Sequence, residues 1–137
     1  MHETTHIDPF LGTTLGGRYL LRECVAEGLR WRRYVAETEG RRALLTTLSA
    51  TLLDTEALSR VLELCGRLAA LEHPHVSPLL DFGRDPAGAL YIVEPGELWH
   101  DLGHELELKG ALHPPRCVEL LQQLLEGLGA LHSAGLT

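Results

Sequence analysis

The sequence predicts an α+β fold: a five-stranded antiparallel sheet with one inserted helix, followed by two C-terminal helices. Two contrasting patterns carry this prediction. Short runs rich in apolar residues, separated by glycine-bearing links, occupy residues 18–49 and 79–94 and are typical of strands. Apolar residues at three- and four-residue steps occupy residues 54–72 and 113–135 and are typical of amphipathic helices.

The first three strands are expected at residues 18–26, 32–38 and 43–49. Brief links, such as the glycine-bearing turn at residues 39–42, favour an antiparallel meander. Residues 1–17 read as a polar lead-in whose glycines favour loop.

The inserted helix is expected at residues 54–72, and it ends where Pro74 disfavours helical geometry in the residue before it. Two further strands are expected at residues 79–84 and 89–94. The intervening Asp-Pro-Ala-Gly stretch, residues 85–88, is favourable turn chemistry.

A shorter helix is expected at residues 98–110 and a longer one at 113–135. Six leucines of the longer helix fall within an arc of roughly 140°, and such a face must be buried. It can fold back on the sheet, pair with its own copy or dock on another protein, and self-association or a protein partner is favoured. The six residues are Leu120, Leu121, Leu124, Leu125, Leu128 and Leu131.

The formal net charge is −7 over 137 residues, which argues against a nucleic-acid partner because phosphate neutralisation needs clustered basic residues. The local exception is the Arg-Trp-Arg-Arg stretch at residues 30–33. Here Arg30, Trp31 and Arg33 are candidates for an anion site or a protein contact, and a solvated hairpin is the alternative.

The three cysteines are widely spaced, so neither a zinc site nor a disulfide framework is expected. No apolar run is long enough for a membrane span, and the first residues do not resemble a signal peptide. The sequence therefore predicts a cytoplasmic protein without a membrane partner.

Four collinear stretches add a resemblance to this picture: DPFLGTTLGGRYLL at residues 8–21, LEHPHVSPLLDFG at 71–83, GALYIVEP at 88–95, and the long helix from Leu112. Together they resemble the start of a bacterial Ser/Thr (Hanks-type) protein kinase domain, over nearly the whole chain. The resemblance implies a lead-in at 1–17, a kinase-like small lobe at 18–97, and hinge-following helices of a truncated large lobe at 98–137.

The resemblance also implies where a nucleotide would lie, and this sequence departs from the family at each position. Of the glycine-rich loop that follows Val25, only Gly28 keeps a glycine, while Trp31 stands at the third glycine position. Arg33 stands where a small β-branched residue packs on the base. The vestigial cofactor-binding positions are Val25, Gly28, Leu44, Thr46 and Glu94.

The charged machinery of phosphoryl transfer is expected to be missing. Thr46 stands where the family carries its phosphate-holding lysine, and Leu64 stands where the helix carries the glutamate that pairs with it. The Asp-Phe-Gly triplet beginning at Asp81 lies on the fourth expected strand, so it cannot be the magnesium-binding triplet, which comes after the catalytic loop. The His-Arg-Asp loop is expected beyond Thr137.

The sequence therefore predicts a catalytically inactive, pseudokinase-like module without catalytic or metal-binding residues and without a cofactor. It is expected to act as a scaffold or regulator through protein contacts, and to self-associate through the leucine-rich helix. Two alternatives stay open: an ATP-binding sensor without phosphotransfer, and a fragment of a longer Ser/Thr protein kinase.

Overall fold

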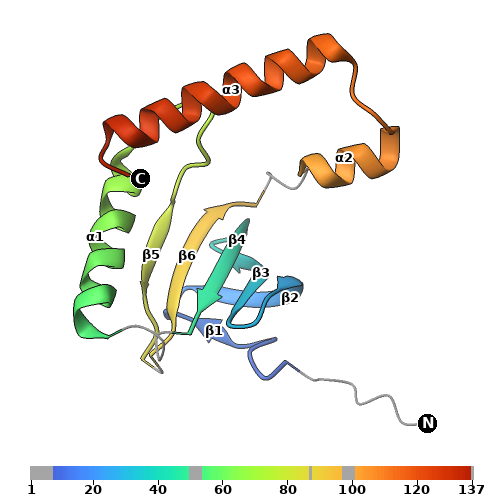
Figure 1. Cartoon of the computed structure of the whole chain (residues 1–137). Coiled ribbons are helices and arrows are strands. Elements are labelled where there is room, and N and C mark those ends of the chain that lie inside the picture. Colours follow the sequence, from blue (N-terminus) through green and yellow to red (C-terminus); the bar gives the residue numbers. More distant parts are fainter. Residues whose placement is uncertain (1–7, 50–53, 87, 97–100, 137) are drawn as a thin grey trace.

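The structure is a computed structural model that describes residues 8–49, 54–86, 88–96 and 101–136. A curled antiparallel sheet carries one helix at its side, and two further helices follow the last strand (Figure 1). The strands lie in the order β1-β2-β3-β4-β6-β5. The elements are β1 (Thr14–Leu15), β2 (Tyr19–Glu27), β3 (Trp31–Thr38), β4 (Arg41–Leu48), α1 (Thr55–Ala70), β5 (Asp81–Arg84), β6 (Leu90–Pro95), α2 (Leu102–Lys109) and α3 (Pro114–Ser133).

The predicted α+β class is confirmed, with one correction: the described sheet has six strands, not five. The additional strand, β1, lies where the sequence predicted loop. The backbone N–H of Gly12 donates to the carbonyl of Leu21 at 2.8 Å, and the N–H of Leu21 donates to the carbonyl of Thr13 at 3.0 Å. Gly16 and Gly17, with φ of 61° and 71°, then turn the chain into β2. A strand of two residues has no periodicity from which it could be predicted.

The inserted helix lies within the predicted range and begins with a side-chain cap. The Asp54 carboxylate accepts from the backbone N–H of Ala57 at 2.7 Å, which satisfies one of the free donors of the first turn. α2 begins at Leu102 rather than residue 98, and residues 97–100 lie outside the described part. The expected division between small lobe and following helices falls there and stays a prediction.

The core lies on one face of the sheet. Alternate residues of the central strands point to this face, and the largest fully buried side chains are Tyr34, Leu21, Leu45 and Val93. The opposite face carries Val35, Leu44 and Phe82, and we call it the α1 face. A carbon added at Gly66 of α1 would lie 3.9 Å from the Phe82 ring, so the helix approaches this face closely at its mid-point.

The curl of the sheet brings β2 to β5, which are not neighbours in strand order. The Tyr19 hydroxyl donates to the Asp81 carboxylate, 62 positions further along the chain. The Tyr19 ring also packs edge-to-face on Tyr91, with centroids 6.1 Å apart. These contacts close the sheet around its core.

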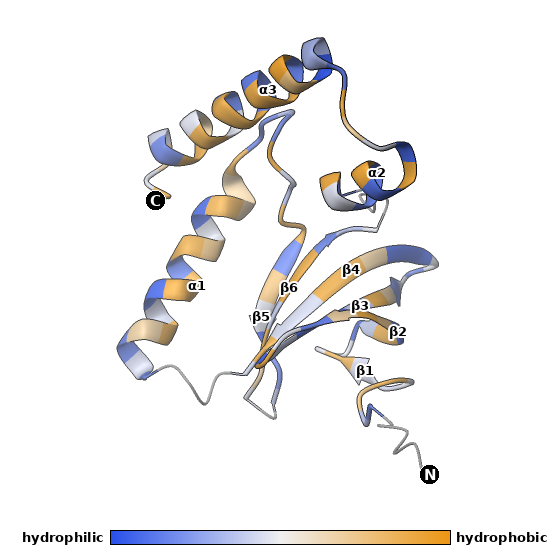
Figure 2. Cartoon of the chain, turned by 45° about the vertical axis from the view of Figure 1, so that its right-hand side comes forward, coloured by the Kyte–Doolittle hydropathy of each residue, from blue (hydrophilic) through white to orange (hydrophobic). Residues whose placement is uncertain are grey.

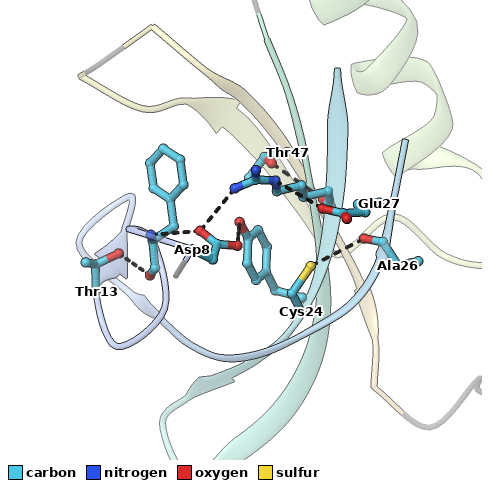
Figure 3. A network of polar contacts seen from close by, with 9 residues as sticks. Asp8, Thr13, Cys24, Ala26, Glu27 and Thr47 are labelled. Carbon is cyan, nitrogen blue, oxygen red and sulfur yellow. Dashed lines mark hydrogen bonds and ion pairs between the residues drawn. The ribbon is translucent and has the colours of Figure 1, made fainter. Parts of the chain in front are cut away.

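Asp8 fixes the described part of the lead-in to β3 (Figure 3). Its carboxylate accepts from the Tyr34 hydroxyl at 2.6 Å and from the backbone N–H of Phe10 at 2.9 Å, and it pairs with Nη1 of Arg32 at 3.2 Å. The described segment from Asp8 onward is therefore tied to the sheet through β3.

α3 crosses the end of α1 and the connection between α1 and β5 (Figure 1). Apolar residues recur along its length (Figure 2). Across the described ranges, no helix combines the length and apolar character that a bilayer span requires.

Candidate functional site

Strand register gathers most of the expected nucleotide-site residues into two adjacent rows on the α1 face. In one row Arg33 lies opposite Thr46, which in turn lies opposite Ile92. In the next row Leu44 lies opposite Glu94. Residues that face each other across strands point to the same side of a sheet. The structure thus brings Leu44, Thr46 and Glu94 together with Arg33.

Thr46 does not stand alone in the lysine position. The Nε atom of Arg33 donates to Oγ1 of Thr46 at 3.2 Å, and both residues are half-buried. Sequence reasoning could place Arg33 on a solvated hairpin, but the register turns its side chain onto the α1 face. A positive charge is therefore present beside Thr46, supplied by the neighbouring strand.

The turn between β2 and β3 is closed by Trp31. The backbone N–H of Gly28 donates to the carbonyl of Trp31 at 2.9 Å. A carbon added at Gly28 would lie 1.9 Å from Nε1 of the Trp31 indole, so the ring lies directly against the glycine backbone. The one retained glycine therefore has its N–H occupied and its open side covered. Val25 lies at an irregularity in the β2–β3 register, between Cys24 and Ala26.

Two carboxylates near the expected site are engaged elsewhere. On α1, Glu63 pairs with Arg67 at 2.9 Å on the exposed surface, while Leu64 is half-buried. On β6, Glu94 accepts from the Ser77 hydroxyl at 3.0 Å.

Each residue of the Asp-Phe-Gly triplet has a structural contact on β5. Asp81 accepts the Tyr19 hydroxyl, and Phe82 faces Gly66 of α1. At Gly83, an added carbon would lie 2.9 Å from the Tyr91 hydroxyl oxygen, so a side chain there would displace that tyrosine. Packing and hydrogen bonding account for all three residues.

Two core tyrosines and two cysteines hold their protons more tightly than they would in water. Burial, assisted by the hydrogen bond to Asp81, raises the pKa of Tyr19, and burial with the bond to Asp8 raises the pKa of Tyr34. Burial also raises the pKa of Cys24 and Cys65, which disfavours their nucleophilic thiolate forms. Among the described residues there is no cluster of three or more potential metal ligands.

The leucine-rich face of α3 is largely exposed. Leu121, Leu124, Leu125 and Leu128 have between 47% and 59% of their surface exposed, while Leu120 and Leu131 are half-buried. Gly127 of α3 is buried against His75 and Val76, in the connection between α1 and β5. The helix thus folds back through its glycine side, and within the described chain four of the six leucines remain uncovered.

A pocket of about 620 Å³ between α2 and α3 adjoins this face. Leu120 and Leu124 contribute to its apolar wall, and Lys109 and Arg116 lie among its polar lining. No sequence signal identifies this pocket, because it depends on how the two helices are placed.

No protein-family model matches the chain. Serine/threonine-protein kinase PknE of Mycobacterium tuberculosis is 34% identical over 127 residues, which cover 88% of this chain and 22% of that protein. Serine/threonine-protein kinase pkn3 of Myxococcus xanthus is 28% identical over 135 residues, covering 96% of this chain and 25% of that protein. The chain therefore spans about a quarter or less of the length of these curated relatives.

Crystal structures of the Mycobacterium tuberculosis PknI kinase domain share the fold. One superimposes with a TM-score of 0.79 at 22% identity, covering 94% of this chain and 53% of that chain. Another gives 0.74 at 22% identity, covering 90% of this chain and 51% of that chain.

The order of strands and helices, the collinear match to the curated kinases and the fold shared with a solved kinase domain agree with one another. The chain is thus a homologue of the bacterial serine/threonine protein kinases, corresponding to the N-terminal part of their kinase domain.

Proposed function

We propose that this chain is a catalytically inactive kinase-like module that acts through protein contacts, by binding a second copy of itself along α3. The exposed leucine face of α3 carries this proposal. The residues at the positions where the family binds its nucleotide support the absence of phosphoryl transfer.

Phosphoryl transfer depends on groups that position the phosphates and stabilise their developing charge. Thr46 offers a hydroxyl where the family has an ammonium group, and that hydroxyl already accepts from Arg33. Glu63, the acidic residue nearest to the expected glutamate position, is paired with Arg67. The N–H of Gly28 is bonded to Trp31. None of these groups is arranged to hold a triphosphate in the family's manner.

The argument for association is energetic. Burying a leucine side chain that was fully exposed contributes roughly 1.5 to 3 kcal/mol, and the four exposed leucines gain about half of this because they are about half exposed. A second copy is the favoured partner because a two-fold interface needs a patch that complements itself. An uncharged leucine stripe meets that condition, whereas the chain's net charge of −7 opposes association through most other surfaces.

Sedimentation velocity over a range of concentrations tests this proposal. The wild-type chain is expected to shift from monomer to dimer as concentration rises, and Leu125→Glu is expected to remain monomeric. Gln122→Glu is the matched control, since it adds the same charge to an exposed α3 position outside the leucine stripe and leaves the dimer intact. A wild-type chain that stays monomeric at every concentration overturns the proposal.

Inactivity is tested separately with labelled ATP and magnesium. No label is expected on the chain or on a general substrate such as casein. Transfer by the wild-type chain that Thr46→Ala abolishes would contradict the proposal.

The position of Arg33 favours a second candidate, an ATP-binding module without transfer, because it returns a positive charge to the neighbourhood of Thr46. The coverage of about half of the PknI kinase domain favours a third, part of a longer kinase whose further residues cover the α3 leucines. A reading frame that continues past Thr137 into a His-Arg-Asp motif would favour that third candidate over self-association.

A further inference from the structure

The cavity of about 620 Å³ between α2 and α3 has the size and lining of a small-molecule site. Such sites are concave, mostly apolar and roughly 300 to 1,000 Å³ in volume. Its walls come from the two helices and from the short connection that joins them (Figure 1). Leu102 of α2, Leu112 of the connection and Leu120 of α3 each contribute an apolar side chain, and Leu124 lies one turn further along α3. The described lining includes none of the expected nucleotide positions.

The two acidic residues of the lining are compensated within α2. The Asp101 carboxylate accepts from the backbone N–H of His104 at 2.6 Å, and so it caps the positive end of the helix dipole. Glu105 pairs with Nζ of Lys109 at 2.8 Å. Neither carboxylate therefore needs a cationic ligand.

The basic residues of the lining keep donors to spare. Arg116 pairs with Glu119 at 3.0 Å, but about half of each side chain is exposed, and an ion pair in that setting contributes little. A guanidinium group has five N–H donors, so Arg116 can hold a second carboxylate. His113 lines the cavity three positions earlier, and residues 109–118 contain no acidic residue. The connection and the first turn of α3 therefore favour an anion.

We propose that this cavity binds an amphipathic carboxylate, that is, an apolar body carrying one carboxylate group, such as a fatty acid. The planar guanidinium of Arg116 holds the carboxylate through paired hydrogen bonds. The apolar body lies against Leu112, Leu120 and Leu124, and its burial supplies most of the affinity.

This site is distinct from the self-association surface, although the two share one residue. Leu121, Leu125 and Leu128 of the exposed leucine face are not among the lining residues, whereas Leu124 belongs to both. Ligand binding can therefore be tested on a chain that does not dimerise, and the two proposals can fail separately.

The test is isothermal titration calorimetry of the wild-type chain with decanoate, below the concentration at which decanoate forms micelles and at constant ionic strength. Decanamide has the same chain without a charge, and decyltrimethylammonium carries a positive charge instead. We expect a single decanoate site, with decanamide binding about tenfold more weakly because it lacks the charge-assisted contact. Decyltrimethylammonium should bind no more tightly than decanamide.

Two variants, each with a matched control, locate the site. Arg116→Gln should weaken decanoate binding by about tenfold and leave decanamide binding unchanged. Its control is Arg60→Gln, which removes the same charge from an exposed ion pair on α1 and should change affinity by less than about twofold. Leu124→Ala should weaken both ligands by about fivefold. Its control is Leu121→Ala, since Leu121 is similarly exposed on α3 but does not line the cavity.

Three results overturn the inference: no decanoate binding by the wild-type chain, tighter binding of decyltrimethylammonium than of decanoate, or an equal loss in a variant and its control. An equal loss in Leu121→Ala and Leu124→Ala would place the ligand on the open leucine face instead. Circular dichroism spectra confirm that each variant is folded. Decanoate binding that persists in Leu125→Glu separates this result from the outcome of the self-association proposal.

Discussion

Gly127 of α3 lies against the backbone carbonyl of His75, so closely that a carbon added to the glycine would stand 2.7 Å from the carbonyl oxygen. The neighbouring Glu126 pairs with Nε2 of His75 at 3.4 Å. This close approach seats α3 on the small lobe through its glycine side. It therefore determines which side of the helix faces outward, and that side carries the exposed leucines.

The contact between Gly127 and His75 leads to a prediction about stability. Gly129, two residues along the same helix, is the control position. Glycine-to-alanine substitution in a helix interior normally stabilises by about 1 kcal/mol. Gly129→Ala should show this gain, because an added carbon there meets nothing within 4 Å. Gly127→Ala should lose it and destabilise instead, because the methyl group meets a backbone oxygen. Urea denaturation of both variants measures the difference, and equal stabilities would show that α3 does not dock through Gly127.

Substitutions that break the contacts of the Asp-Phe-Gly triplet should reduce the stability of the fold rather than the binding of a metal ion. Tyr19→Phe should destabilise the fold by about 1 to 2 kcal/mol, since it removes the hydrogen bond to the part-buried Asp81 carboxylate. Asp81→Asn should destabilise it too, while adding magnesium should leave the melting temperature of the wild-type chain unchanged. A magnesium-dependent rise that Asp81→Asn abolishes would contradict the structural role.

Replacing Thr46 with lysine, the residue that the family carries at this position, should destabilise the fold. Thr46→Lys places a second positive charge beside Arg33 on the half-buried α1 face, with Glu63 already paired to Arg67. We expect a loss of about 1 to 3 kcal/mol relative to Thr46→Met, which has similar length without charge. The double variant Arg33→Val/Thr46→Lys should recover much of this loss. A denaturant-based double-mutant cycle measures the coupling between the two positions, and additive effects would mean that the two charges do not meet.

Alkaline pH should unfold the chain as its tyrosines ionise. Burial raises the pKa of Tyr19, Tyr34 and Tyr91 above the ordinary value of about 10. The folded state therefore holds these phenol protons more tightly than the unfolded chain does. Their stabilisation is complete below pH of about 10 and is lost as the pH rises above it.

Tyrosinate absorbance and circular dichroism, followed together during an alkaline titration, check this expectation. The two signals should change at the same pH, above that at which the urea-unfolded chain titrates. Ionisation of one or more tyrosines near pH of about 10 in a chain that is still folded would show that burial does not control them.

The long elements could be predicted from the sequence because each repeats its pattern several times. Three local signals agree with the observed elements. They are the periodic leucines of α3, the helix-ending Pro74 and the apolar runs of the central strands. β1 could not be predicted, because two residues define no period. Its pairing depends on glycine turns and on hydrogen bonds to Leu21.

The site was less predictable, since it depends on relationships between elements. Sequence reasoning identified Thr46 as a hydroxyl in a lysine position but could not assign Arg33 to the same row, because that requires the β3–β4 register. It also expected all six leucines of α3 to form one interface. Their division into exposed and half-buried members follows from where Gly127 meets His75, which no periodicity encodes.

The bond between Tyr19 and Asp81 has a consequence for biosynthesis. Contacts between residues far apart in sequence form late and slow the folding of the regions they join, because a long loop must close first. During translation, β2 emerges well before the strand that will hold it. The sheet can complete its closure only once β5 and β6 have left the ribosome. Until then strands β1 to β4 form an open sheet whose β4 edge, which later pairs with β6, is a risk for misassociation.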